Sequence, residues 1–243
     1  MMFARCTGTV ALVVSALLSG CATVPPPPPY AARYGYRPRV GAGGKGISIA
    51  LVKPQYPAAT AAIFQATGQE PPNLRALNDA LARSLLQYFN ANGFTVSGPF
   101  AKVDDMTFPE KKQADLLLSA EVNVEFAWPS GAGMTRRSGW DGSLSVNWVG
   151  DCGCAGTISF VIWEPLSMQR MWSKSVDIPK RQIDCTFEGD AKTADIVGQN
   201  QQARLFEQVF PSVMATAERY FNAEEMALVK QQTKELREKK VYQ

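Results

Sequence analysis

Residues 115–128 read DLLLSAEVNVEFAW and carry the clearest strand pattern in the chain. Successive side chains of a strand point to opposite faces, so every second residue shares a face. One face is wholly apolar and holds Leu116, Leu118, Ala120, Val122, Val124, Phe126 and Trp128. The other face is mostly polar and holds Leu117, Ser119, Glu121, Asn123, Glu125 and Ala127. This alternation is typical of an antiparallel sheet with one solvated face.

The residues that follow predict further strands of the same kind. Residues 140–149 repeat the alternation, and residues 157–163 and 168–178 form another pair of apolar runs. A turn-like link, Glu164-Pro165-Leu166-Ser167, joins that pair. We therefore expect an antiparallel strand meander in this half of the chain.

The residues upstream predict a parallel unit. The run ISIALV at 47–52 suits a buried strand, and residues 94–97 suit a second one. Between them, leucines at steps of three and four give a helix one apolar stripe. Asn73 after two prolines is the expected N-cap of this helix, and Asn92-Gly93 is its expected end. A strand, a helix and a strand in this order favour a parallel pair.

The end of the chain predicts two helices. Residues 194–221 have an apolar stripe, and Pro211 within it is expected to kink or split the helix. Residues 223–240 are highly charged, which favours a largely exposed helix that is available to a partner. The expected fold class is α+β: a βαβ unit, an antiparallel strand meander and C-terminal helices. We expect a single domain over 47–221, followed by the charged helix in 222–243.

Residues 1–21, MMFARCTGTVALVVSALLSGC, predict a secretory signal with a lipid attachment site. One cation, Arg5, precedes a short apolar core, and the ending Leu18-Ser19-Gly20-Cys21 resembles the bacterial lipobox. We expect residues 1–20 to be removed and Cys21 to carry the lipid that anchors the protein. Ala22 at the next position is typical of an outer-membrane address.

Residues 21–46 are the predicted tether between this lipid and the folded domain. Five prolines at 25–29 favour a stiff polyproline II spacer, and glycine, arginine and tyrosine are frequent after them. The simplest interpretation is a solvated linker. The alternative is that its basic residues attract anionic lipid headgroups or the cell wall.

The composition excludes several classes of function. Among 243 residues there is no histidine, which removes Ser-His-Asp and Cys-His nucleophile systems and every His-ligated metal site. The formal net charge of +3 is too small to indicate nucleic-acid binding. We expect no catalytic residue, no metal and no cofactor besides the covalent lipid on Cys21, and so predict that the protein is not an enzyme.

Three cysteines remain after the signal and the lipid site: Cys152, Cys154 and Cys185. In an oxidising compartment, three thiols suggest one disulfide and one leftover thiol. We expect Cys185 to pair with either Cys152 or Cys154, both of which lie in a predicted loop, 151–154, between two strands. A redox pair is less favoured, because this acidic loop offers no positive surroundings for a thiolate.

The 129–139 segment is the candidate ligand-binding loop. It contains Arg136 and Arg137, and Trp128 and Trp140 flank it. Guanidinium groups bind carboxylates, including that of sialic acid, and aromatic faces pack against sugar rings. The plainer alternative is an exposed hairpin loop with no ligand.

Three blocks carry a family resemblance. They are PEKKQADLLLSAEVNVEFAWP at 109–129, ISFVIWEPLSMQRMWSKSVDI at 158–178 and ARLFEQVFPSVMATAERYFNAEEMALVKQQTKELREKK at 203–240. Together with the lipoprotein signal, they resemble the neuraminyllactose-binding haemagglutinin family of lipid-anchored outer-membrane proteins, described as adhesins and associated with the flagellar sheath. The basic stretch proposed for sialoside binding in that family would fall in the 129–139 loop, where Arg136 and Arg137 stand for it.

This resemblance implies a non-catalytic binding or adhesion module whose partner is a sialylated glycan or an envelope or flagellar protein. The strand and helix pattern is also similar to that of periplasmic envelope-assembly lipoproteins. The alternative function is therefore a structural or assembly lipoprotein of the cell envelope that faces the periplasm.

The lipid site gives the first testable prediction. Cys21→Ala removes the thiol that accepts the lipid, so we expect an unprocessed precursor that takes up no fatty-acid label. Metabolic labelling followed by immunoprecipitation measures this directly. A mutant that is labelled as strongly as the wild type would contradict the assignment.

Overall fold

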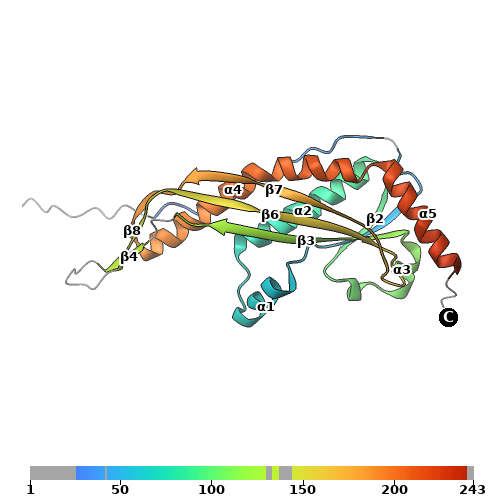
Figure 1. Cartoon of the computed structure of the whole chain (residues 1–243), viewed down its shortest axis with the longest axis horizontal. Helices are drawn as coiled ribbons and strands as arrows, with labels where there is room; N and C mark the ends of the chain where they lie inside the picture. The colour runs from blue at the N-terminus through green and yellow to red at the C-terminus, as the bar shows by residue number, and fades with distance from the viewer. Residues whose placement is uncertain (1–25, 42, 130–132, 137–143, 240–243) are drawn as a thin grey trace, which may run out of the picture.

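The computed structural model describes residues 26–41, 43–129, 133–136 and 144–239, and these form an elongated molecule (Figure 1). Its strands are β1 (Ser48–Val52), β2 (Thr95–Phe100), β3 (Leu116–Ala127), β4 (Gly133–Arg136), β5 (Leu144–Trp148), β6 (Asp151–Trp163), β7 (Arg170–Asp184) and β8 (Phe187–Asp190). They form a five-stranded sheet in the order β2-β1-β3-β6-β7 and a three-stranded sheet in the order β4-β5-β8.

The five-stranded sheet joins a parallel unit to an antiparallel meander. β1 lies between β2 and β3 and is parallel to both, and helix α2 (Pro72–Ala91) lies on the connection from β1 to β2. β6 is antiparallel to β3 on one side and to β7 on the other. The predicted α+β class and both modes of pairing are confirmed. The predicted N-cap is wrong: Asn73 lies inside α2, because Pro71 occupies the cap position and Pro72 begins the helix.

Strand β3 buries one face along most of its length, as its sequence predicts. The side chains of Leu116, Leu118, Ala120 and Val122 are at most 4% exposed, whereas Glu121, Asn123 and Glu125 on the other face are exposed. Helices α2 and α4 (Ala191–Tyr220) supply the partners of the buried face within one hydrophobic core. The opposite face is covered mainly where Leu117 packs in a small second cluster.

Helix α4 is continuous, so the predicted split at Pro211 is wrong. Proline in a helix interior costs about 3 kcal/mol, because it removes a backbone donor and its ring clashes with the preceding turn. The neighbouring Phe210, Val213 and Met214 are nevertheless almost fully buried. Burial of such side chains contributes about 1.5–3 kcal/mol each, which outweighs the cost of one proline.

The three-stranded sheet lies at one end of the molecule, on the left in Figure 1. β5 is antiparallel to both β4 and β8. β4 lies within the segment that the sequence predicts as a loop, so part of 129–139 is strand. The four residues of β4 show no alternation of their own, and they are a strand because they pair with β5. Trp140, the predicted start of the next strand, lies outside the described residues, and β5 begins at Leu144.

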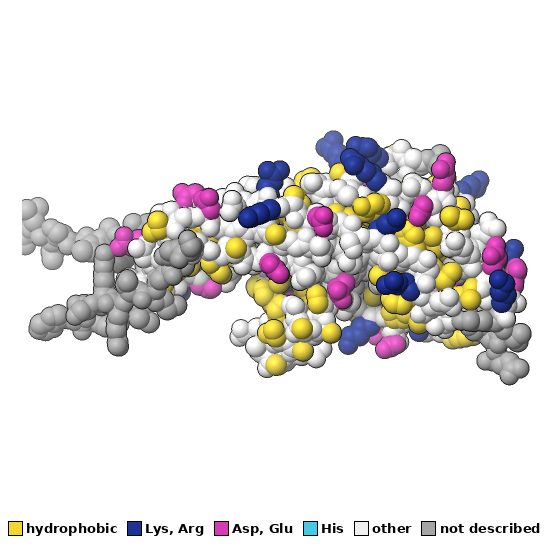
Figure 2. Space-filling model, in the orientation of Figure 1, with side chains coloured by type: hydrophobic (Ala, Val, Ile, Leu, Met, Phe, Trp, Pro, Cys, Tyr) yellow, Lys and Arg dark blue, Asp and Glu magenta, His cyan; other side chains and the backbone are white. Residues whose placement is uncertain are grey.

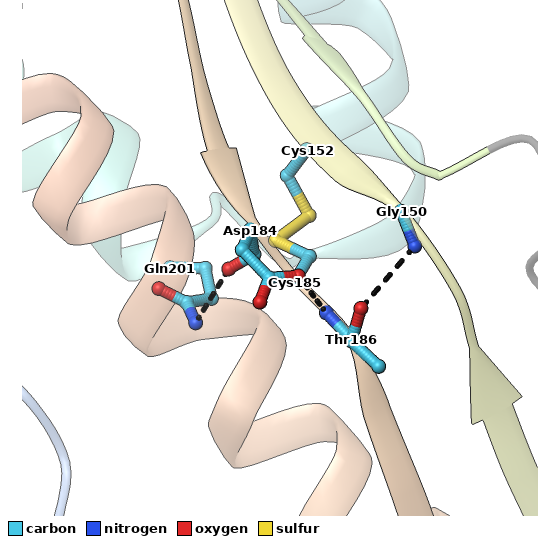
Figure 3. The surroundings of a disulfide bond; sticks show 6 residues. All are labelled: Gly150, Cys152, Asp184, Cys185, Thr186 and Gln201. Atoms are coloured by element: carbon cyan, nitrogen blue, oxygen red, sulfur yellow. Dashed lines mark hydrogen bonds between the residues drawn. A yellow bond between two sulfur atoms is a disulfide. The ribbon is translucent and has the colours of Figure 1, made fainter.

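A disulfide joins Cys152 in β6 to Cys185, which lies between β7 and β8 (Figure 3). The two Cα atoms are 5.5 Å apart, an ordinary separation for bridged cysteines. Around it, the Gln201 side chain of α4 donates a hydrogen bond to the carbonyl of Asp184, and the Thr186 hydroxyl accepts one from the Gly150 backbone. The bridge therefore fixes the connection between β7 and β8, where the chain leaves the five-stranded sheet and enters the three-stranded sheet.

Register decides which cysteine Cys185 pairs with. Cys152 lies opposite Ile183, two residues before Cys185, whereas Cys154 lies opposite the more distant Arg181. The sequence prediction of a bridge to Cys185 is confirmed, and its partner is Cys152. The predicted loop at 151–154 is wrong, because these residues begin β6. Cys154 is a buried free thiol, and burial raises its pKa, which makes it a poor nucleophile.

Two short helices have no counterpart in the sequence prediction. α1 (Ala58–Thr67) follows β1, and α3 (Phe108–Gln113) precedes β3 after a 3-10 turn at Val103–Asp105. α3 is held by a capping box, in which Thr107 and Glu110 each satisfy a backbone N–H of the other. α1 has no buried residue and projects below the sheet in Figure 1. Its sequence, AATAAIFQAT, has no amphipathic stripe that would indicate a helix.

The described part of the predicted tether lies against the domain instead of forming a solvated linker. Near its start, the Asn200 side chain in α4 donates a hydrogen bond to the carbonyl of Pro28 and accepts one from the backbone of Tyr30. Further along, the Tyr34 ring packs on Phe210 at 5.1 Å between centroids, and the Tyr36 hydroxyl donates to Glu218. Burial raises the pKa of both tyrosines. Residues 28–39 therefore run along α4 as part of the folded structure.

The last helix, α5 (Ala223–Lys239), is also more integrated than its charge predicts. Met226, Val229 and Thr233 are at most 2% exposed, so its apolar side is used within the domain. Near its end, Arg237 Nε donates to Glu164 Oε1 at 2.7 Å, and Arg237 Nη2 donates to the Ala114 carbonyl at 2.8 Å. We call this contact the Glu164–Arg237 clasp.

The clasp holds a fully buried carboxylate, because the Glu164 side chain is 0% exposed. Burial alone raises the pKa of Glu164, but hydrogen bonds from Ser167, Arg237 and Leu166 outweigh it and lower the pKa to about 2. The carboxylate is therefore ionised at neutral pH and is held in place by its donors.

The clasp predicts a large effect of Arg237→Ala on stability. The variant leaves the Glu164 carboxylate buried without its cation, and such losses cost about 3–5 kcal/mol. Lys234→Ala in the same helix is the matched control, because Lys234 is 75% exposed and its pairing with Glu238 contributes under about 1 kcal/mol. Urea denaturation at pH 7 measures both, and equal stabilities of the two variants would refute the role of the clasp.

The disulfide predicts a definite count of thiols in the mature lipidated protein. The native protein should react slowly with a thiol reagent, since Cys154 is buried. After denaturation without reductant we expect one reactive thiol, and after reduction three. In Cys154→Ser we expect no reactive thiol after denaturation without reductant and two after reduction. Three reactive thiols in the unreduced denatured protein would show that the bridge does not form.

Candidate functional site

Four aromatic side chains form a continuous row beside the smaller sheet. Phe126 at the end of β3 contacts Trp128 with ring centroids 4.8 Å apart, Trp128 contacts Trp148 of β5 at 4.8 Å, and Trp148 contacts Phe187 of β8 at 5.5 Å. Edge-on and tilted ring pairs at these distances are favourable by about 0.5–1.5 kcal/mol each. We call this row the aromatic end of the molecule.

Helix α4 supports the aromatic end through a glycine. A Cβ atom on Gly198 would lie 2.4 Å from Cη2 of Trp128 and 3.2 Å from Cη2 of Trp148. The missing side chain therefore lets both indoles approach the helix backbone. This contact places the aromatic end over the N-terminal part of α4.

Part of this end is apolar surface exposed to solvent. Trp128 is 49% exposed and Val149, just after β5, is 56% exposed. Trp148 is half-buried, in agreement with its place on the apolar side of its strand. The exposed apolar surface of these two side chains suits contact with a ring, an acyl chain or another apolar surface.

The structure describes only part of the predicted ligand-binding set. Trp128 lies in the aromatic row, and Arg136 lies at the end of β4, opposite Leu144 of β5. Arg137 and Trp140 lie outside the described residues. The grouping of Arg136, Arg137, Trp128 and Trp140 as a glycan site therefore stays a prediction. Trp148 and Phe187 were not in the predicted set, and only their position across two strands brings them to Trp128.

A cleft of about 520 Å³ opens between α1, the end of β1 and the start of α2. Tyr56 and Phe64 line it with their rings 5.0 Å apart, and the largely buried Asn78 lines it as well. The carboxamide oxygen of Asn78 is buried and has no hydrogen-bond partner among the described residues. Because the cleft depends on α1, the sequence pattern gave no indication of it.

The charged groups around this cleft pair with one another. Lys53 Nζ lies 3.5 Å from Asp79 Oδ1, and Arg75 Nε lies 2.9 Å from Glu70 Oε2. The Tyr56 hydroxyl donates to the same Glu70, and burial together with this hydrogen bond raises the pKa of Tyr56. A neutral tyrosine and paired ions suit the binding of a polar ligand better than proton transfer near neutral pH.

The described residues contain no group of three or more His, Cys, Asp or Glu side chains placed to hold a metal ion. None of their helices is long and apolar enough to cross a membrane.

No protein-family model matches the chain, and no curated protein matches it in sequence. Among solved structures, its fold is similar to that of a Helicobacter pylori protein described as a neuraminyllactose-binding hemagglutinin homolog. The TM-score is 0.56 at 16% identity, over 84% of this chain and 98% of that chain. A DUF330 protein from Xanthomonas campestris aligns over 85% of this chain and 98% of that chain, with a TM-score of 0.42 and 11% identity. The resemblance predicted from the sequence is thus supported at the level of the fold alone.

Proposed function

We propose that this protein is a non-catalytic binding protein of the bacterial envelope, anchored in the outer membrane by a lipid on Cys21. The lipobox ending at Cys21 and the Ala22 that follows it support the anchor and the address. The fold shared with a hemagglutinin homolog supports binding in place of catalysis.

The observation that carries this proposal is the packing of residues 28–39 against α4. Hydrogen bonds from Asn200 hold the first of these residues, and Tyr34 and Tyr36 pack further along the helix. A lipid on Cys21 would therefore be joined to the folded domain through only a few residues. Such an anchor keeps the domain beside its membrane, as a binding protein of the envelope requires.

Two versions of this function differ in what is bound. In the first, the protein is an adhesin on the cell surface, and Trp128, Trp140, Arg136 and Arg137 bind sialylated glycans. In the second, the protein faces the periplasm and binds an envelope or flagellar protein. The short fastened connection favours the second, because it does not extend the domain away from the membrane.

The structure changes which surface is available to a protein partner. The sequence predicts helix α5, whereas the structure favours α1. Helix α5 uses Met226, Val229 and Thr233 within the domain, so removing it should unfold the protein instead of only releasing a partner. Helix α1 has no buried residue, and its Ile63 is 60% exposed beside the cleft. Figure 2 shows hydrophobic side chains gathered on the lobe below the sheet, where Figure 1 places α1. We therefore assign the partner surface of the second version to α1 and the cleft.

Protease treatment of intact and permeabilised cells tests the choice between the two versions. We expect the folded domain to survive proteinase K in intact cells and to be cleaved once the outer membrane is permeabilised. A resident periplasmic protein is the control for membrane integrity. Cleavage in intact cells would overturn the periplasmic version and favour adhesion, which binding of the purified protein to sialylated glycans would then test.

A further inference from the structure

We propose that the aromatic end rests on the lipid surface, so that Trp128 and Val149 contact the membrane and the α3–α5 end points away from it. This inference deepens the proposed function and rests on lipidation of Cys21. It concerns the orientation of the domain, which lipidation alone does not determine.

The first step is where the fastened segment begins. Asn200 binds both Pro28 and Tyr30, and it lies two residues after Gly198, on which Trp128 and Trp148 are packed. Two residues of helix span about 3 Å along the axis. The start of the described chain and the aromatic end therefore lie at the same end of α4. In Figure 1 this is the end of the smaller sheet, and α3 and α5 lie at the other end of the long axis.

The second step is the reach of the chain that carries the lipid. Five peptide units separate Cys21 from Pro26, and a fully extended chain of this length spans about 17 Å. The lipid must lie at the membrane surface. The end of the domain next to Pro28 is consequently held close to that surface. The α5 end could approach the membrane only if the segment after Cys21 were released from α4.

The third step is the chemistry of the surface that this places next to the lipid. Trp128 is 49% exposed and Val149 is 56% exposed, and Tyr30 of the fastened segment is 37% exposed. Tryptophan and tyrosine are enriched where protein meets the membrane interface, because one side of the ring is apolar and the other is polar. The rings of the aromatic end are fixed by one another and by Gly198, so that Trp128 is held in position for this contact.

The neighbouring charges indicate which kind of lipid fits. Charges of both signs are exposed near the aromatic end: Asp151, Glu188 and Asp190 are acidic, whereas Lys192 and Arg204, which lies over the Tyr30 ring, are basic. This end therefore carries no excess of positive charge that would select an anionic surface. The contact is therefore apolar and suits zwitterionic headgroups. It requires no basic patch, since the covalent lipid already supplies the binding energy.

Quenching of tryptophan fluorescence by brominated lipids tests this orientation. The lipidated full-length protein is reconstituted in vesicles of phosphatidylethanolamine and phosphatidylcholine, with bromine on the acyl chains. We expect quenching of the wild type and a loss of much of it in Trp128→Phe. Trp163→Phe is the matched control, because Trp163 ends β6 on the far side of the sheet and binds Ser119. Equal quenching in the two variants would overturn the inference.

A second pair of variants controls for the case in which Trp128→Phe disturbs the packing of the aromatic row. In the Trp128→Phe background, Val149→Trp should restore quenching, because position 149 is exposed at the same end. Phe108→Trp should not restore it, although Phe108 in α3 is 64% exposed, because it lies at the opposite end. Restoration by Phe108→Trp alone would show that the domain lies the other way up.

Vesicle flotation separates failure of this inference from failure of the proposed function. A mature protein that does not float with the vesicles lacks the lipid anchor, and both proposals are then wrong. A protein that floats but shows equal quenching in all variants keeps the anchor and refutes the orientation.

Discussion

The structure depends on the need of strand β3 to bury one face and leave the other in water. Leu118, Ala120 and Val122 require apolar partners along most of the strand, and α2 and α4 provide them in one core. Glu121, Asn123 and Glu125 require solvent, so the other face is buried only near the start of β3, where Leu117 packs in the second cluster. The two helices that cover β3 and the solvated part of its other face follow from this division.

The length of α4 is the main consequence of that arrangement. The helix covers the sheet and continues to the aromatic end, where Gly198 receives two indoles. Its outer surface holds residues 28–39, and Glu218 near its end accepts a hydrogen bond from Tyr36. A single helix thus connects the core, the aromatic end and the segment that follows the proposed lipid site. The disulfide at Cys185 and the Glu164–Arg237 clasp fix the strands at the two ends.

The parts of the fold that could be predicted are those with a strong local pattern. The alternation in β3, the leucine stripe of α2 and the turn after β6 each carry their own signal, and all three are confirmed. α1 and β4 could not be predicted in this way, since α1 has no amphipathic stripe and β4 is defined by pairing with β5. The candidate site was predicted only around Trp128, because Trp148, Phe187 and Gly198 reach it from other strands and a helix.

The sequence by itself determined which chemical groups are present: an ending at Cys21 that resembles a lipobox, no histidine, one strand with a single apolar face and a cysteine after the last long strand. Only the tertiary structure decided which residues meet. Register gave Cys185 its partner Cys152, and contacts across α4 turned a predicted linker into a fastened segment. The physical reason is distance along the chain. Hydrophobic periodicity reports a residue's own face, whereas a contact between positions such as 28 and 200 forms only after the core has placed both.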